Sequence, residues 1–196
     1  MIKTSDIETF ILAGGKSSRM GDDKGMLRVN GKHLIEFTIE PLKKSGLNPK
    51  IIANNESYKI FGLEVFPDEV KGKGPIGGLL TSMVNCKRDH LLLISCDMPF
   101  ISEDSVAYLL AESEDGKICV SSDGEKINPL FAIYPVTILG FVNSRINENK
   151  LKMTELILSS DHRVINMSAM LKNNPYLFLN INTRSDFENL RHSLNK

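Results

Sequence analysis

A short loop near the N-terminus combines glycines with positive charge directly after a hydrophobic run. The run is Ile7–Leu12, and it leads into Leu12-Ala13-Gly14-Gly15-Lys16-Ser17-Ser18-Arg19-Met20-Gly21-Asp22-Asp23-Lys24. Glycines let the backbone turn tightly and approach a ligand with no Cβ in the way. Bare backbone N–H groups and fixed cations at a strand end bind phosphates. The loop therefore predicts a nucleoside triphosphate site, with Lys16, Arg19 and Lys24 as its cations.

The loop lacks the spacing of the phosphate-binding loop of common NTPases. That pattern requires Gly, four residues, and then Gly-Lys-Ser or Gly-Lys-Thr. Here Gly15-Lys16-Ser17 would need a glycine at position 10, where the sequence has Phe10. The pattern instead favours a loop that wraps a triphosphate, with Arg19 and Lys24 reaching its oxygens, over a solvated surface turn.

A second chemical feature is an aspartate at the end of a hydrophobic run. The sequence is Leu91-Leu92-Leu93-Ile94-Ser95-Cys96-Asp97-Met98-Pro99. Asp97 could bind Mg²⁺, which suits one or two carboxylates plus substrate phosphates, or it could cap the next helix. Ser102 is the better cap for a helix at Glu103, which favours the metal role. Cys96 is interpreted as a buried apolar residue, since no histidine motif accompanies it to activate a thiol.

A third segment, Asp68–Gly78, contains the pattern Gly72-x-Gly74-x-x-Gly77, and Asp97 lies twenty residues beyond Gly77. A dinucleotide-binding fingerprint has this form, but its glycines directly follow a strand. Here several polar residues separate Phe66 from the glycines, and Pro75 lies inside the turn. The segment is better interpreted as a loop that leads into a helix N-terminus at Gly77.

Runs with strand character alternate with helix-like segments along the chain. The expected strands are Ile7–Leu12, Lys50–Ala53, Leu63–Phe66, His90–Ser95, Ile118–Val120, Phe131–Tyr134 and Leu177–Asn180. The expected helices are Leu34–Lys44, kinked or divided by Pro41, Gly77–Asn85, Glu103–Glu112, Val136–Arg145, Met153–Leu158 and a last helix capped by Thr183. This alternation predicts an α/β fold with a mainly parallel sheet, and ligands bind beyond the carboxyl ends of such strands. All three chemical segments fall at expected strand ends.

Composition narrows the function further. The chain has 196 residues, which indicates one domain over 1–196, and Lys plus Arg number 24, as do Asp plus Glu. Balanced charge argues against a nucleic-acid partner. Apolar runs such as Leu91–Ile94 are far too short to span a membrane. The three cysteines have no Cys-x-x-Cys spacing, which favours a reducing, cytoplasmic location.

The first loop resembles the signature of the molybdenum cofactor guanylyltransferases. That signature is Leu-Ala-Gly-Gly, then Arg-Met-Gly, then Asp-Lys, and this chain carries each element. The related cytidylyltransferase typically has Leu-Ala-Ala-Gly, so Gly14 points to guanine. The resemblance implies a three-layer α/β/α sandwich of the Rossmann-like nucleotide-diphospho-sugar transferase type. It implies an enzyme that transfers GMP from GTP to Mo-molybdopterin and releases pyrophosphate.

The resemblance also implies roles for individual residues. Arg19, Lys24 and Asp97 would be catalytic, and Asp97 would hold Mg²⁺. The implied GTP contacts are Leu12, Ala13, Gly14, Gly15, Lys24, Asp68, Gly77 and Asp97. Asn180 and Asn182, in Asn180-Ile181-Asn182-Thr183, would face the pterin, although Arg184 stands where the family usually has proline. Asn128 is a weaker acceptor-side candidate, and the register of Asn54 and Asn55 leaves a nucleotide contact there open.

GTP and Mo-molybdopterin are the implied partners, together with molybdoenzyme maturation proteins, and no nucleic acid or membrane is implied. Three alternatives remain open from the sequence. The chain could be a related nucleotidyltransferase that uses CTP or makes an NDP-sugar or NDP-alcohol. It could be a non-catalytic nucleotide-binding maturation factor. It could also be a nicotinamide-dependent oxidoreductase, which the displaced glycine pattern disfavours.

Overall fold

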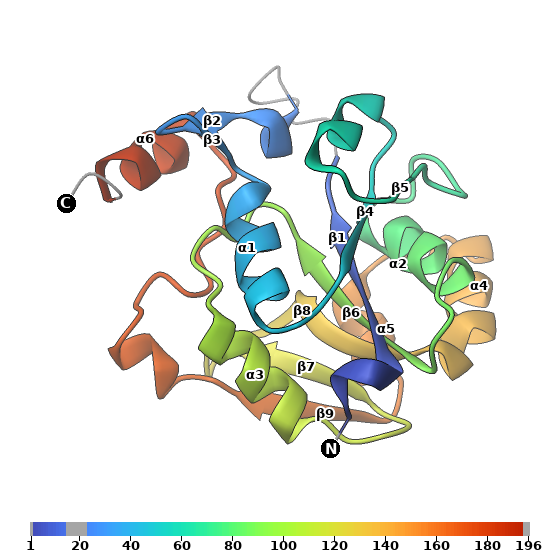
Figure 1. Ribbon diagram of the computed structural model, residues 1–196. Coiled ribbons are helices and arrows are strands. Elements are labelled where there is room, and N and C mark those ends of the chain that lie inside the picture. Colours follow the sequence, from blue (N-terminus) through green and yellow to red (C-terminus); the bar gives the residue numbers. More distant parts are fainter. Residues whose placement is uncertain (1, 15–22, 194–196) are drawn as a thin grey trace.

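A seven-stranded sheet forms the centre of the computed structural model, which describes residues 2–14 and 23–193 (Figure 1). Its strand order is β5-β4-β1-β6-β8-β7-β9. The strands are β1 (Ile7–Leu12), β4 (Pro49–Ile52), β5 (Val65–Phe66), β6 (His90–Ser95), β7 (Ile118–Ser122), β8 (Ile127–Pro135) and β9 (His162–Asn166). β8 runs antiparallel to β6 and β7, and the other pairings in this sheet are parallel. The predicted mainly parallel sheet is confirmed.

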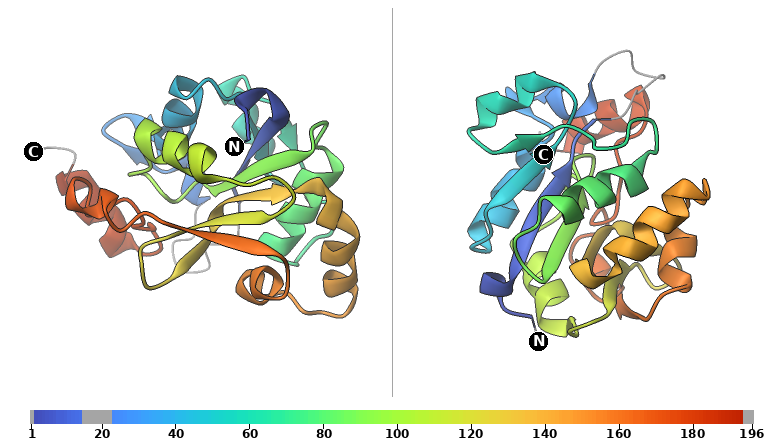
Figure 2. Two further views of the ribbon diagram at one scale, coloured as in Figure 1. Left: turned by 90° about the horizontal axis from the view of Figure 1, so that it is seen from below. Right: turned by 90° about the vertical axis from the view of Figure 1, so that its right-hand side faces the viewer.

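Helices cover both faces of the sheet (Figures 1 and 2). On one face lie α1 (Glu36–Lys44) and α3 (Glu103–Glu112); on the other lie α2 (Pro75–Val84), α4 (Leu139–Asn147) and α5 (Met153–Leu158). Successive strand residues enter the two cores in turn: Ile11 packs with α1 and α3, whereas Phe10 packs with α2, α4 and α5. The predicted three-layer α/β/α sandwich is confirmed.

Every residue of strand β6 is buried. Its four aliphatic residues, Leu91–Ile94, have no exposed surface, and they alternate between the two cores. Full burial of each such side chain contributes about 1.5–3 kcal/mol relative to an exposed one. β6 also pairs in parallel with β1, with Leu12 opposite Ser95. The residues that follow these two strands therefore leave the sheet at the same level.

A small layer outside the main sheet combines an early hairpin of the chain with the C-terminal helix. The hairpin of β2 (Arg28–Val29) and β3 (Lys32–His33) lies beside the C-terminal helix α6 (Arg184–Ser193) (Figure 1). Its turn residues Asn30 and Gly31 both have positive φ, as a two-residue type I′ turn requires. A separate hydrophobic cluster beneath it contains Val29, Leu34, Ile181 and Leu190. The sequence patterns did not predict this hairpin.

One expected strand is absent, and one strand of the sheet was not predicted. Leu177–Asn180 is not a strand: its backbone forms turns, in which Leu177 donates to Asn174 and Leu179 donates to Tyr176. The sheet edge beside β7 is taken instead by β9, which contains only two aliphatic residues and has one fully buried position. Helix α1 also runs through Pro41 without being divided. Within the described residues, no helix is long and apolar enough to cross a membrane.

Gly78 on α2 sets how closely this helix approaches the end of β1. A Cβ at Gly78 would lie 2.7 Å from Leu12 Cδ2, whereas one at Gly140 on α4 would meet nothing within 4 Å. We expect Gly78→Val to lower the free energy of unfolding by about 1–3 kcal/mol through overpacking. The control Gly140→Val should change it by less than about 0.5 kcal/mol. Denaturant unfolding measures both, and equal effects would contradict this packing role.

Candidate active site

The carboxyl ends of β5, β4, β1 and β6 bring the chemical segments to one edge of the sheet. Their last residues pair in register, with Leu12 opposite both Ile52 and Ser95, and Ile52 opposite Phe66. Gly14 follows β1, Asp68 follows β5 and Asp97 follows β6. The expectation that these segments share one edge is confirmed.

Lys24 joins three parts of the chain at this edge. Its Nζ donates a hydrogen bond of 2.8 Å to Asn182 Oδ1 and lies 3.6 Å from Asp97 Oδ2. A backbone hydrogen bond joins the same two segments, because Ile181 N donates to Asp97 O at 2.9 Å. Lys24, Asp97 and Asn182 thus form one cluster, although Lys24 and Asn182 are 158 positions apart in the sequence. The side chains of Lys24 and Asp97 are 21% and 17% exposed, so the cluster is sheltered but open to a ligand.

The start of α6 holds Asn182 in place. Asp186 accepts hydrogen bonds from the backbone N–H groups of Asn182 and Thr183, at 2.9 and 2.8 Å, and Asp186 N donates to Thr183 Oγ1 at 3.1 Å. The predicted helix cap at Thr183 is confirmed. The backbone donor at Asn182 is the main cause that lowers the pKa of Asp186, so this carboxylate stays ionised as an acceptor.

Asp68 and Asn54 form a reciprocal pair beyond the ends of β5 and β4. Asn54 Nδ2 donates to Asp68 Oδ2 at 2.8 Å, and Asp68 N donates to Asn54 Oδ1 at 3.1 Å. Asn54 is therefore the asparagine that faces Asp68, while a nucleotide contact by Asn54 or Asn55 stays a prediction. The pairing fixes one carboxylate oxygen of Asp68, a half-buried residue.

A second network fixes the residue before Lys24. Tyr58, on the 3-10 helix Glu56–Phe61, donates its hydroxyl hydrogen bond to Asp23 Oδ1, and Asn55 Nδ2 donates to Asp23 Oδ2 at 3.1 Å. Tyr58 is fully buried, and burial is the largest cause that raises its pKa, so the hydroxyl remains a donor. Gly25 allows this contact because a Cβ there would lie 2.3 Å from Tyr58 Oη. We call the group of Tyr58, Asn55 and Asp23 the Asp23 clamp.

The sequence carries no local signal for the Asp23 clamp. Its pattern indicates Asn55 only as a possible nucleotide contact, and no motif surrounds Tyr58. A tyrosine 35 residues from an aspartate carries no local signal, because only the fold brings the two together.

The glycine loop enters the site through a backbone that only glycine adopts readily. Gly14 has φ +122° and is exposed, directly after the buried Ala13. The backbone polar groups before it are used by the sheet: Leu12 O accepts from Cys96 N at 3.0 Å, and Ala13 N donates to Ile52 O at 2.9 Å. Gly14 therefore begins the part of the loop that is available to a ligand. Gly15 and Arg19 lie outside the described residues.

Gly77 lies in the first turn of α2, after Gly74 at φ +63°. Gly77 N donates to Gly74 O at 3.0 Å, and a Cβ at Gly77 would lie 3.1 Å from both Val70 O and Lys73 Cβ. The geometry thus explains Gly77 by close packing of the loop on the helix. A nucleotide contact there stays a prediction.

Three further residues lie near the end of β6 or on the segment before α6. Cys96 is buried, and burial raises the pKa of its thiol, which fits the predicted packing role. Asn128, near the start of β8, lies 3.5 Å from Met98 Sδ, so it is close to the Asp97 segment. Asn180 is exposed on the turn that leads to Asn182.

The donor set around Asp97 suits a hard cation that takes part of its shell from a substrate. Asp97 supplies a carboxylate, and Asn182 supplies an amide oxygen close to the same lysine. Over residues 2–14 and 23–193, no group of three or more His, Cys, Asp or Glu side chains could hold a metal. Mg²⁺ commonly uses one or two carboxylates plus phosphate oxygens and water, so the residues fit it.

An α/β/α sandwich with a glycine turn, a lysine and a strand-end aspartate at one sheet edge is the architecture of a nucleotidyltransferase. The family described as MobA-like NTP transferase domain matches residues 9–162. A probable molybdenum cofactor guanylyltransferase of Flavobacterium johnsoniae is 32% identical over 96% of this chain and 98% of its own. The molybdenum cofactor guanylyltransferase of Shewanella sp. strain ANA-3 is 35% identical over 97% and 98%. This chain belongs to the molybdenum cofactor guanylyltransferase family.

A solved structure supports the fold. The molybdopterin-guanine dinucleotide biosynthesis protein A from Archaeoglobus fulgidus superimposes with a TM-score of 0.81 over 96% of this chain and 98% of its own, at 22% identity. At this identity the likeness concerns the fold alone.

The Asp23 clamp predicts a positioning role for Tyr58. We expect Tyr58→Phe to lower kcat/KM for nucleotidyl transfer about tenfold or more, because Asp23 then loses one of its two donors beside Lys24. The matched control is Tyr134→Phe, which also removes a buried hydroxyl, one that donates to Pro129 O at 2.7 Å in β8. Both variants should lose about 0.5–1.5 kcal/mol of stability. Equal activity in the two variants would remove the clamp from catalysis.

Proposed function

We propose that this protein transfers GMP from GTP to the phosphate of Mo-molybdopterin, giving the guanine dinucleotide cofactor and pyrophosphate. The observation that carries the proposal is the cluster of Lys24, Asp97 and Asn182, which joins the glycine-loop side of the edge to the C-terminal segment. The relatives of this chain that are named guanylyltransferases support the same reaction. Molybdoenzyme maturation proteins are its expected partners.

In this reaction an anionic phosphate oxygen of the acceptor attacks the α-phosphorus of GTP. A new P–O bond forms, the bond from the α-phosphorus to the bridging oxygen breaks, and the electron pair leaves with pyrophosphate. No general base is needed because the nucleophile already carries the charge. The protein must therefore hold the two substrates in line and offset the charge that develops on the leaving group.

The cationic side chains of the site suit this task. The ammonium of Lys24 lies at this edge beside the side-chain oxygens of Asn182 and Asp97. From there it is proposed to bind the triphosphate of GTP. Arg19 is proposed as a second cation, since a guanidinium binds phosphate oxygens in a bidentate manner. Mg²⁺ held by Asp97 would supply further positive charge to the phosphate oxygens.

The two substrates would use different halves of the edge. Gly14 and Asp68 are proposed to contact GTP from the ends of β1 and β5, with Leu12, Ala13, Gly15 and Gly77 as the remaining contacts. Asn182 gives its oxygen to Lys24, so its amide N–H groups remain to donate to the pterin-bearing acceptor. Asn180 is proposed to bind the acceptor beside it.

A nucleotide panel tests the class of substrate. We expect GTP with Mg²⁺ to raise the melting temperature more than CTP, UTP, ATP or NAD do, since a ligand that binds the native state stabilises it. A larger rise in melting temperature with CTP would indicate that the enzyme recognises cytosine and not guanine. Stabilisation by NAD alone would indicate an oxidoreductase. GTP binding without pyrophosphate release in the presence of Mo-molybdopterin would indicate a non-catalytic maturation factor.

Asp97→Asn tests the metal site. The variant keeps the shape of the side chain but removes its charge, so we expect GMP transfer to fall about 10²–10³-fold or more. The control is Asp161→Asn, at an exposed carboxylate before the start of β9, on the opposite edge. Transfer is followed by pyrophosphate release, and folding by thermal unfolding. Near-normal transfer by Asp97→Asn would overturn the role of this carboxylate.

A further inference from the structure

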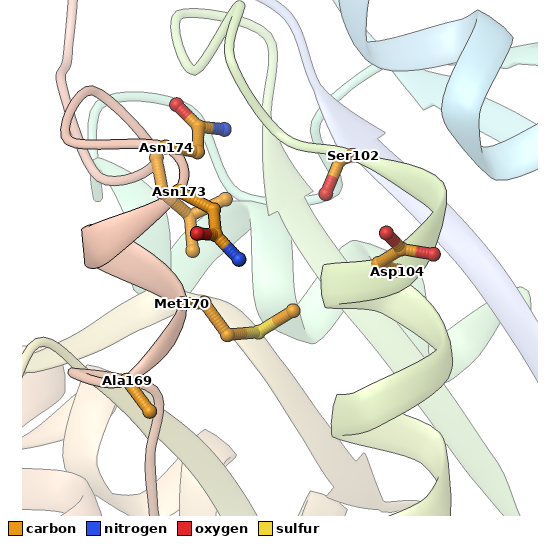
Figure 3. Close-up of a pocket in the computed structure, with 7 residues that line it drawn as sticks. Ser102, Asp104, Ala169, Met170, Asn173 and Asn174 are labelled. Carbon is orange, nitrogen blue, oxygen red and sulfur yellow. The ribbon is translucent and has the colours of Figure 1, made fainter.

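A cavity of about 240 Å³ lies between the start of α3 and the segment after β9 (Figure 3). It is lined by Ser102, Asp104, Ala169, Met170, Asn173, Asn174 and Leu177. In Figure 3, Met170 and Asn173 extend from one wall toward α3, and Ser102 and Asp104 lie across from them. None of the residues assigned above to GTP, the metal or the pterin lines it.

The cavity belongs to the same edge of the sheet as the active site. Helix α3, one wall of the cavity, follows the carboxyl end of β6. β7 and β9 run in the same direction as β6, so the segment after β9, the other wall, leaves the sheet at the same edge. Ser102 is five residues beyond Asp97, a span of at most about 18 Å of extended chain. A ligand that reaches from Asp97 to this cavity is therefore of small-molecule length.

Two hydrogen bonds hold the segment after β9 beside the segment after β6, from the active site to the cavity. Ile181 N donates to Asp97 O at 2.9 Å at the active-site end, and Asn174 Nδ2 donates to Phe100 O at 2.8 Å at the cavity end. Between them, the rings of Phe100 and Tyr176 lie 5.3 Å apart at 35°. Tyr176 is 51% exposed, so it offers an aromatic surface along the path.

The lining selects one kind of ligand. No lysine or arginine is among the lining residues, and Asp104 carries a negative charge, so a phosphate group would be repelled. Met170 and Leu177 provide apolar contacts for a flat ring, while the side chains of Asn173 and Asp104 provide hydrogen bonds. The oxygen of Ser102 is already used as the cap of α3, where it accepts from Ser105 N at 3.2 Å.

We propose that this cavity binds the pterin ring of the acceptor, through the amino-pyrimidinone edge that faces Asp104. That edge carries an exocyclic amino group beside a ring N–H, two parallel donors that match the two acceptor oxygens of a carboxylate. The volume suits a single bicyclic ring, being below the roughly 300–1,000 Å³ of sites for drug-sized ligands. The inference rests on the proposed function for its choice between pterin and guanine, because guanine carries the same edge.

The test uses pterin, whose own fluorescence reports binding, and guanosine as a competitor on the full-length protein. We expect saturable pterin binding that guanosine displaces poorly, and we expect Asp104→Asn to weaken it about tenfold or more, since one amide cannot accept two parallel hydrogen bonds. The matched control is Glu103→Gln, which removes a neighbouring charge in the same helical turn but does not line the cavity. Met170→Trp, which fills the cavity, should also abolish pterin binding.

GTP binding, measured by thermal stabilisation, should be unchanged in all three variants. Equal pterin affinity in Asp104→Asn and Glu103→Gln would overturn the inference, as would no saturable pterin binding up to about 1 mM. Loss of GTP binding rather than pterin binding in Asp104→Asn would assign the cavity to guanine and also overturn it. Pterin binding in the cavity by a protein that fails to transfer GMP would instead count against the proposed function alone.

Discussion

The contact of Lys24 with Asp97 and Asn182 is the interaction on which the site depends. It is the point where the loop after β1, the end of β6 and the start of α6 meet. An ion pair of this exposure, with 3.6 Å between the charged atoms, contributes only about 1 kcal/mol or less to stability. Its importance is therefore positional: it places one ammonium between a carboxylate and an amide at the edge where the substrates would meet.

The rest of the fold keeps that ammonium in place from both sides. Asp23, one residue before Lys24, is held by Tyr58 and Asn55, which belong to the segment after β4. Asn182 is held from the other side, because Asp186 binds the backbone of the first turn of α6. The first support follows a strand of the main sheet, and the second belongs to α6 in the layer outside it. Lys24 is therefore held through the residue before it and through its partner Asn182.

The strand ends were predictable because their signals are local. β1, β6, α3 and α5 have the bounds that the apolar runs and the Ser102 cap predict, and Asp97 lies two residues beyond the end of the buried strand β6. β9 was not predictable: its sequence, His162–Asn166, is mostly polar, and it is a strand because the edge beside β7 is open to it. The run at Leu177–Asn180 is apolar but is not a strand, because Leu177 and Phe178 reach the core from a turn.

The same distinction holds within the site. Lys24, Asp97 and Asn182 could be chosen one at a time, from a resemblance and from positions at strand ends, but their contact could not. Tyr58 and the pairing of Asn54 with Asp68 depend on how β4 and β5 end relative to β1, and a shift of one residue would exchange Asn54 and Asn55. Residue type and strand position therefore identify groups that do chemistry, whereas the groups that hold them become visible only once the sheet has fixed the register.

The position of Lys24 also explains how one edge serves two substrates. β1, β4 and β5 supply the glycine turn and Asp68, while β6, β8 and the C-terminal segment supply Asp97, Asn128 and the asparagines. Lys24 belongs to the first group by sequence and contacts the second in space. In the proposed reaction, both substrates would bring phosphate oxygens to this boundary, where the phosphorus is transferred. A cation there would stabilise the reacting group in both its starting and its final position.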